Sequence, residues 1–169
     1  TKPENAENVT DLSYSHVKYI NKKLNSEKAL DEVKLAKAFC HANNCYGAES
    51  YIRGFSGYAL ELLICHYGSF LKFVRAFSKI KGKEIIDVER HFRTRGDVLV
   101  NVNESKLQSP VILIDPTHKN RNALAALSNE TFDKFQKACL LFLKNPSRKF
   151  FDKKDIDFEE IERRAQMRK

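Results

Sequence analysis

Hydrophobic residues fill positions 58–67 of the chain except at Glu61 and His66. Such a run is too short to span a membrane and too apolar for a helix with one face in water. We therefore expect a buried central helix that starts after the glycine-rich segment 54–57 and ends near Gly68. The small residues before the helix allow a phosphate or another backbone to approach its N-terminus closely.

Four further segments have hydrophobic residues at the three- and four-residue spacing of an amphipathic helix. The first begins at a cap at Ser13 or Ser15, and the second covers roughly residues 28–43, with Lys37 on or beside its apolar stripe. The third follows the central helix directly, and Ser128 caps the fourth. Their apolar positions are Val17, Ile20 and Leu24; Leu30, Val33, Ala36, Phe39 and Cys40; Phe70, Leu71, Phe73, Val74 and Phe77; and Phe132, Phe135, Cys139 and Phe142.

Two short stretches have the pattern of β-strands. Valine occupies every second position of residues 98–102, and residues 111–114 form a continuous, mainly β-branched run. We expect these strands to pair across a turn in residues 103–110. The basic segment 78–96 is expected to be a loop, with its charges in water or against a phosphate backbone. The pattern predicts an α+β fold, mainly α, with a small antiparallel β element.

The composition fits a folded domain with an anionic partner. A chain of 169 residues has room for one domain, or for one domain and the start of a second. Its hydrophobic content of 42%, with 12 Phe and 6 Tyr, is enough for a packed core. The net charge of +8 favours nucleic acid or nucleotide as the partner.

The four cysteines lie mostly within apolar patterns, and the sequence shows neither a signal peptide nor a long apolar span. We therefore expect a reduced, cytoplasmic setting without a membrane. The spacing of Cys40, His41 and Cys45 matches no common zinc pattern. We predict no metal site and interpret the cysteines as small core residues.

A search for catalytic motifs finds no complete site. A nucleotidyl-transferring palm needs a Gly-Ser turn and, about ten residues later, two carboxylates one residue apart that hold two magnesium ions. The Gly-Ser pair at 68–69 is separated from the carboxylates of 87–89 by a predicted helix, and no Gly-Ser pair precedes those of 155–157. No Walker-type phosphate loop is present either. We therefore predict no catalytic residue in this sequence.

Three blocks of the sequence together resemble the archaeal-type (class I) CCA-adding enzymes, a family of tRNA nucleotidyltransferases. They are YGAESYIRGFSGYALELLICHYGSF at 46–70, ILIDPTHKNRNALAALS at 112–128 and FLKNPSRKFF at 142–151. The resemblance covers residues 10–152 and the blocks follow the family's order. It corresponds to the family's second domain and the start of its C-terminal part, and it does not cover the N-terminal catalytic palm.

The resemblance implies the helical substrate-binding fold of nucleotidyltransferases, similar to that of poly(A) polymerases and oligoadenylate synthetases. It divides the chain into a central nucleotide- and primer-binding domain at 1–128 and a helical start of the C-terminal region at 129–169. Enzymes of this family add C, C and A to the 3′ end of tRNA from CTP and ATP without a template. Mg²⁺ is held by their palm, so we expect this chain alone to lack the metal-binding carboxylates and to be inactive.

The resemblance also implies five nucleotide-binding residues. Lys37 and Tyr46, at the family's spacing, match the pair that holds the triphosphate. Arg121 matches an arginine that reads the incoming base together with the primer backbone. His16 matches a nucleotide-contacting histidine, and Ser13 is expected to supply a further hydroxyl. Both are expected at the N-terminus of the first helix, where unpaired N–H groups attract anions.

The partners implied are the tRNA 3′ end, CTP, ATP and a palm domain, in cis or as a separate chain. One alternative is a stand-alone basic RNA-binding module without catalytic activity. Another is the substrate domain of a related polymerase, such as a poly(A) polymerase or an oligoadenylate synthetase. The block at 112–128 resembles the CCA-adding family more closely than these polymerases.

Overall fold

The computed structural model describes the backbone of residues 9–152 and the side chains of residues 13–152. Helices dominate this part of the chain and a small sheet accompanies them, which confirms the predicted mainly-α, α+β class. The helices are α1 (Val9–Lys23), α2 (Glu27–Ala42), α3 (Gly57–Tyr67), α4 (Phe70–Phe77), α5 (Arg95–Asn101) and α6 (Asn129–Lys144), with short 3₁₀ turns at Glu104–Lys106 and Arg148–Phe150. The strands are β1 (Glu84–Asp87), β2 (Val111–Asp115) and β3 (His118–Asn122).

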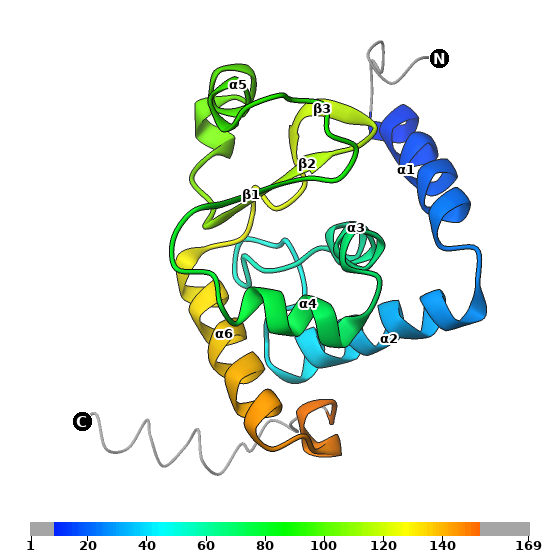
Figure 1. Cartoon of the computed structure of the whole chain (residues 1–169), viewed down its shortest axis with the longest axis vertical. Coiled ribbons are helices and arrows are strands. Elements are labelled where there is room, and N and C mark those ends of the chain that lie inside the picture. The colour runs from blue at the N-terminus through cyan, green and yellow to red at the C-terminus, as the bar shows by residue number, and fades with distance from the viewer. Residues whose placement is uncertain (1–8, 153–169) are drawn as a thin grey trace.

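The sheet separates α5 from a layer formed by α2, α3, α4 and α6, while α1 runs along one side of the molecule (Figure 1). All five residues of β2 are buried because both faces of this strand are covered. Val111 and Leu113 join the core of the helical layer. Ile112 and Ile114 pack on the other face, against α5.

The predicted central helix is confirmed as α3. The Ser56 hydroxyl accepts a hydrogen bond of 3.2 Å from the Ala59 N–H and caps its first turn. Gly68 ends it in the left-handed conformation, with φ of +78°, and donates its N–H to the Ile64 carbonyl. The apolar residues between these caps are almost fully buried. The helix contacts α1, α2 and α4, so it lies at the centre of the helical layer.

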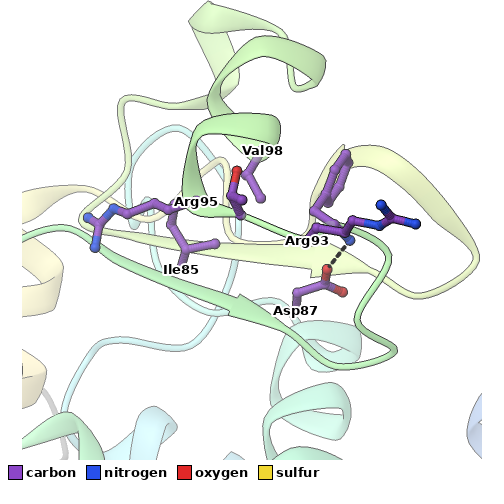
Figure 2. Close-up of a pocket in the computed structure, with 7 residues that line it drawn as sticks. Ile85, Asp87, Arg93, Arg95 and Val98 are labelled. Carbon is purple, nitrogen blue, oxygen red and sulfur yellow. Dashed lines mark hydrogen bonds between the residues drawn. The ribbon is translucent and has the colours of Figure 1, made fainter.

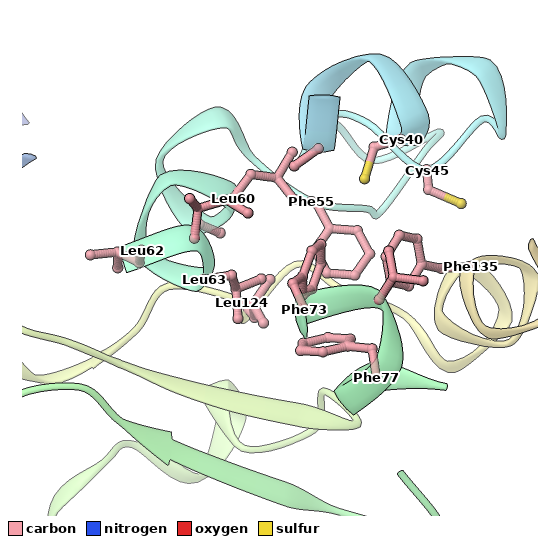
Figure 3. Close-up of a cluster of buried hydrophobic side chains, with 14 of the residues drawn as sticks. Cys40, Cys45, Phe55, Leu60, Leu62, Leu63, Phe73, Phe77, Leu124 and Phe135 are labelled. Atoms are coloured by element: carbon pink, nitrogen blue, oxygen red, sulfur yellow. The ribbon is translucent and has the colours of Figure 1, made fainter. Parts of the chain in front are cut away.

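Phenylalanine rings from the loop before α3, from α4 and from α6 meet beside α3 (Figure 3). The ring centroids of Phe55 and Phe135 lie 4.7 Å apart, and those of Phe73 and Phe77 lie 4.6 Å apart. Edge-to-face and offset contacts at such distances add to the free energy gained from burial. Because Phe135 belongs to α6, that helix shares the core of the preceding segments. The division at residue 128 stays a prediction.

The predicted faces of the helices are largely confirmed. Cys40, Cys45 and Cys139 are buried in the core, as expected, and Cys65 is half-buried. The exceptions are Val17, Leu30 and Leu71, which were predicted to be core residues and are exposed. The charged tail predicted after residue 152 lies outside the described residues.

The predicted strand at residues 98–102 is wrong, because this segment forms α5. Thr94 and Asp97 form a reciprocal capping box, in which each side chain accepts a hydrogen bond from the other residue's backbone N–H. Val98 and Val102 are buried at helical spacing, whereas Val100 is 85% exposed. Valines at every second position also include a pair four residues apart, which is a helical spacing. The capping box favours the helix because it satisfies the backbone groups of the first turn.

The sheet is mixed and not purely antiparallel. β1 pairs with β2 in parallel, with Glu84 opposite Val111, and β2 pairs with β3 in antiparallel. The prediction of a loop across residues 78–96 is therefore wrong at β1, whose sequence is only four residues long and begins and ends with a carboxylate. Two apolar residues between two carboxylates do not show the alternation of apolar and polar residues that distinguishes a strand from a charged loop.

A hollow of about 310 Å³ lies where α5 faces β1 (Figure 2). Arg93 and Arg95 extend from its rim in opposite directions. Asp87 accepts a hydrogen bond of 2.9 Å from the Phe92 N–H through Oδ2, whereas its Oδ1 has no hydrogen-bond partner in the described part of the chain. Asp87 therefore holds the turn that leads from β1 toward α5.

Candidate functional site

The first predicted site residues lie on α1, but not at its end. Because α1 already begins at Val9, Ser13 and His16 are inside the helix and the predicted position at its N-terminus is wrong. The N–H groups there bond to carbonyls within the helix and are not free to bind an anion. The side chain of His16 is instead only 14% exposed and lies against Asp115 of the sheet.

Asp115, the last residue of β2, is fully buried and gathers four polar side chains. Its Oδ2 lies 3.0 Å from Nε2 of His16 and accepts a 3.1 Å hydrogen bond from Nη1 of Arg121. Its Oδ1 accepts hydrogen bonds from the Tyr58 hydroxyl at 3.0 Å and from Thr117, through both the backbone N–H and the hydroxyl. We call these five residues the Asp115 cluster.

The Asp115 carboxylate stays ionised inside the cluster. Burial alone would raise the pKa of Asp115, but hydrogen bonds from His16 and Thr117 outweigh burial and lower that pKa from 3.8 to about 2. Burial and the neighbouring carboxylate raise the pKa of the Tyr58 hydroxyl, which keeps its proton and donates it. A fixed negative charge therefore orients His16 and Arg121.

Arg121 remains partly open to solvent. Its side chain is 41% exposed, and only Nη1 forms hydrogen bonds with residues of the described region. The other nitrogens of the guanidinium fork are available to an external acceptor. The ring of His16 is stacked on that of Tyr58, with 3.9 Å between centroids, so its orientation is fixed as well.

Lys37 and Tyr46 meet at the N-terminus of α3. The ammonium of Lys37 donates a 2.7 Å hydrogen bond to Oε1 of Glu61, so this half-buried carboxylate has a basic partner. A methyl group placed on Gly57 would lie 3.1 Å from the Tyr46 hydroxyl and 3.8 Å from the Lys37 ammonium. Gly57 therefore allows both polar groups to lie directly against the helix. The Tyr46 ring is stacked on His41 at 3.8 Å.

The loop before α3 fixes Tyr46 in this place. The N–H of Phe55 donates to the Cys45 carbonyl and the N–H of Gly54 to the Gly47 carbonyl, so the loop folds back on itself. A Cβ on Gly54 would lie only 2.1 Å from the Cys45 carbonyl oxygen, which excludes any larger residue without movement of the backbone. The glycine-rich segment thus serves the close approach of two backbones, as its sequence predicted.

A hollow of about 350 Å³ between α1 and α3 links the two groups of residues. Ser13, His16, Tyr58 and Glu61 are among the residues that line it. His16 and Tyr58 belong to the Asp115 cluster, and Glu61 binds Lys37. Two of the predicted residues, Ser13 and His16, therefore line this hollow directly. Lys37 reaches it through Glu61 and Arg121 reaches it through His16. Tyr46 lies beside Gly57, one residue before Tyr58.

The sequence missed Asp115, Tyr58 and Thr117 as site residues. In the sequence Asp115 only follows the predicted strand 111–114 and precedes Pro116. A carboxylate directly after a buried apolar strand is a recognisable signal, because it must find several donors when buried. Its partner His16 is 99 residues away in the chain, a pairing that no local pattern contains.

Two further observations bear on the nature of the site. No group of three or more His, Cys, Asp or Glu side chains within the described residues is placed to hold a metal ion. The carboxylate of Glu89, part of the rejected 87–89 motif, instead binds Lys23 at 2.8 Å and accepts a hydrogen bond from Tyr19. None of the helices between residues 9 and 152 combines the length and hydrophobicity needed to cross a membrane.

Comparison with known proteins assigns the family. The model of the tRNA nucleotidyltransferase second domain matches residues 31–152. The chain is 39% identical over 144 residues to the CCA-adding enzyme of Nanoarchaeum equitans, covering 85% of this chain and 36% of that protein. The CCA-adding enzyme of Methanocaldococcus jannaschii is 40% identical over 152 residues, with 89% of this chain and 33% of that protein covered.

The CCA-adding enzyme of Thermococcus gammatolerans is 39% identical over 143 residues, which cover 83% of this chain and 31% of that protein. The chain thus spans about a third of the length of the curated relatives it matches. The matched segment contains most of α2, all of α3 to α6 and the whole sheet. The chain therefore belongs to the family of the archaeal CCA-adding enzymes and carries the second domain of these tRNA nucleotidyltransferases.

Proposed function

We propose that this chain is the part of a CCA-adding tRNA nucleotidyltransferase that binds the incoming CTP or ATP and the 3′ end of tRNA. The observation that carries the proposal is the meeting of the Lys37 ammonium and the Tyr46 hydroxyl over Gly57, at the N-terminus of α3. The names of the relatives, all CCA-adding enzymes, support the same reaction.

The geometry around Gly57 suits a triphosphate. Lys37 supplies a positive charge and Tyr46 a hydroxyl donor, both against the positive end of a helix eleven residues long. The Lys37 side chain is 33% exposed, and an ammonium has three donors. Lys37 can therefore keep its bond to Glu61 and still donate to a phosphate oxygen.

The Asp115 cluster suits the base and the primer. Asp115 holds one nitrogen of Arg121, and the remaining fork is free to bond a base edge and a phosphate in one plane. His16 lies 2.9 Å from the same Arg121 nitrogen and lines the hollow toward α3. We assign His16 and Arg121 to contacts with the nucleotide and the tRNA 3′ end, and Ser13 to the wall of the same hollow.

Nucleotidyl transfer also requires groups outside the described residues. In this reaction the 3′ hydroxyl of tRNA attacks the α-phosphate of the nucleotide and pyrophosphate leaves. We propose that Mg²⁺, held by a palm domain in cis or on a separate chain, supplies the activation of that hydroxyl. The described side chains do not form a carboxylate group fit for that ion, so we assign them binding and orientation only.

The test is steady-state kinetics with a palm domain from a relative and a tRNA that lacks its 3′ CCA. Lys37→Met and Tyr46→Phe are expected to raise the KM for CTP and ATP, by about 10- to 100-fold for Lys37→Met, because a charge-assisted hydrogen bond contributes about 1.5–3 kcal/mol. Lys34→Met is the matched control, since Lys34 lies on the same helix and pairs with exposed Asp31. An unchanged KM in both Lys37→Met and Tyr46→Phe would contradict the assignment.

A further inference from the structure

A separate groove of about 820 Å³ lies on the outer side of α6, where the chain turns back after the helix. It is formed by α6 and by the 3₁₀ turn at Arg148–Phe150, and it shares no residue with the hollow between α1 and α3. Its floor is apolar and its rim is basic. The floor is formed by Ala138, Leu141 and Phe150, and the rim by Lys137, Lys144 and Lys149.

The groove is unusual for a solvated surface. Leu141 is 59% exposed and its neighbour Leu140 is 55% exposed, although both lie on a helix whose other face is fully packed. A fourth lysine that lines the groove, Lys134, pairs with Glu130 at 2.8 Å, whereas the three rim lysines form no ion pair with any residue of the described region. An apolar floor bordered by unpaired cations is complementary to a segment that alternates apolar and acidic side chains.

We propose that residues 155–162 of this same chain occupy the groove. Their sequence, DIDFEEIE, contains five carboxylates, three large apolar residues and no basic residue. The apolar side chains of Ile156, Phe158 and Ile161 would cover the floor, and the carboxylates would pair with the lysines on the rim. The residues outside this segment carry a net charge of +13 and offer few segments of this kind.

The chain that follows Asp152 is long enough to bring residues 155–162 to the groove. The described chain ends at Asp152, two residues after Phe150, which is itself part of the groove. Phe158 lies six positions after Asp152, and an extended chain over six positions reaches about 20 Å. The groove follows α6 from Asn145 back to Lys134, a distance of about 16 Å along the helix axis. Residues 155–162 can therefore reach its whole length.

RNA would be attracted by the same lysines, but it does not account for the floor. A phosphate backbone binds cations and gains nothing from Leu141 and Phe150, whereas an amphipathic peptide uses both features. We therefore favour the acidic segment, and RNA is an outcome that the experiment below distinguishes.

The sequence contains no tryptophan, so Phe158→Trp places a single fluorescent reporter in the full chain. We expect a blue-shifted emission and a slow quenching by acrylamide, because the indole would lie on the apolar floor. Adding Lys137→Glu and Lys144→Glu should shift the emission to the red and increase the quenching constant several-fold. Lys72→Glu is the control, because Lys72 is exposed on α4 and does not line the groove.

Circular dichroism of each variant verifies that the fold is kept. Emission typical of a solvent-exposed tryptophan in the Phe158→Trp chain would overturn the proposal. A blue shift that stays unchanged in the groove variants, which carry Lys137→Glu and Lys144→Glu, would also overturn it. A blue shift that grows with protein concentration would show that a second copy fills the groove, which also overturns it. If the groove variants weaken tRNA binding on filters while the emission stays the same, the groove binds RNA and the proposal is wrong.

Discussion

The Asp115→Asn substitution tests how far the Asp115 cluster depends on one charge. The change keeps the shape of the side chain but removes the negative charge that His16 and Arg121 face. It also replaces one accepting oxygen with an NH₂ group, which cannot accept from its neighbours. We expect the folded chain to lose stability at neutral pH.

The pKa of Asp115 gives the size of this loss. Since the folded protein lowers that pKa from 3.8 to about 2, the ionised carboxylate contributes stability above pH 3.8 that disappears as the pH falls toward 2. The linkage relation converts this difference to about 2 kcal/mol at pH 7 and about half of that at pH 3. The side chain is fully buried, so solvent screening reduces the value little.

Urea unfolding followed by circular dichroism, at several pH values between 7 and 3, measures the effect. The free energy of unfolding of Asp115→Asn should be lower than that of the wild type by about 2 kcal/mol at pH 7, and the gap should narrow toward pH 3. Asp133→Asn is the control, because Asp133 is exposed on α6. If the difference in the free energy of unfolding between the two proteins stays constant from pH 7 to pH 3, the charge of Asp115 is not the cause of the lost stability.

Three further substitutions test the packing around the site. Gly54→Ala should lower the free energy of unfolding by more than 1 kcal/mol in urea titrations, because its Cβ would overlap the Cys45 carbonyl. Phe135→Ala should lower it by about 3–5 kcal/mol, because a ring at the centre of the core is lost, and a loss below 1 kcal/mol would place Phe135 outside the core. Gly57→Ala should leave stability nearly unchanged but raise the KM for CTP severalfold with an added palm, because its Cβ would crowd the Tyr46 hydroxyl; an unchanged KM would contradict this.

The sequence predicted those parts of the fold that local signals define. The limits of α3 follow from Ser56 and Gly68, and the start of α6 follows from Ser128, whose hydroxyl accepts from the Thr131 N–H. These signals work because a cap satisfies backbone groups of the nearest turn. The pairing of Lys37 with Glu61 is not among these parts, because a lysine beside a core stripe can also extend its ammonium into solvent.

Other features were not predicted, either because a local pattern fits two structures or because tertiary contacts decide the outcome. The valines of residues 98–102 fit a helix and a strand alike, and only the capping box at Thr94 and Asp97 favours the helix. β1 is a strand because β2 pairs with it across more than twenty residues of chain. The Asp115 cluster joins α1, α3 and the sheet, so its members become neighbours only in the folded chain.

The most direct test of the proposed function is addition of nucleotides to tRNA. The full chain is combined with a palm domain from a relative, a tRNA lacking its 3′ CCA, labelled CTP and ATP, and Mg²⁺. The proposal predicts that C, C and A are added in order, and that the rate falls strongly when Arg121→Ala or Lys37→Met replaces the wild-type chain. Tight tRNA binding by the chain, without any incorporation in the presence of the palm, would contradict it and favour a stand-alone RNA-binding module.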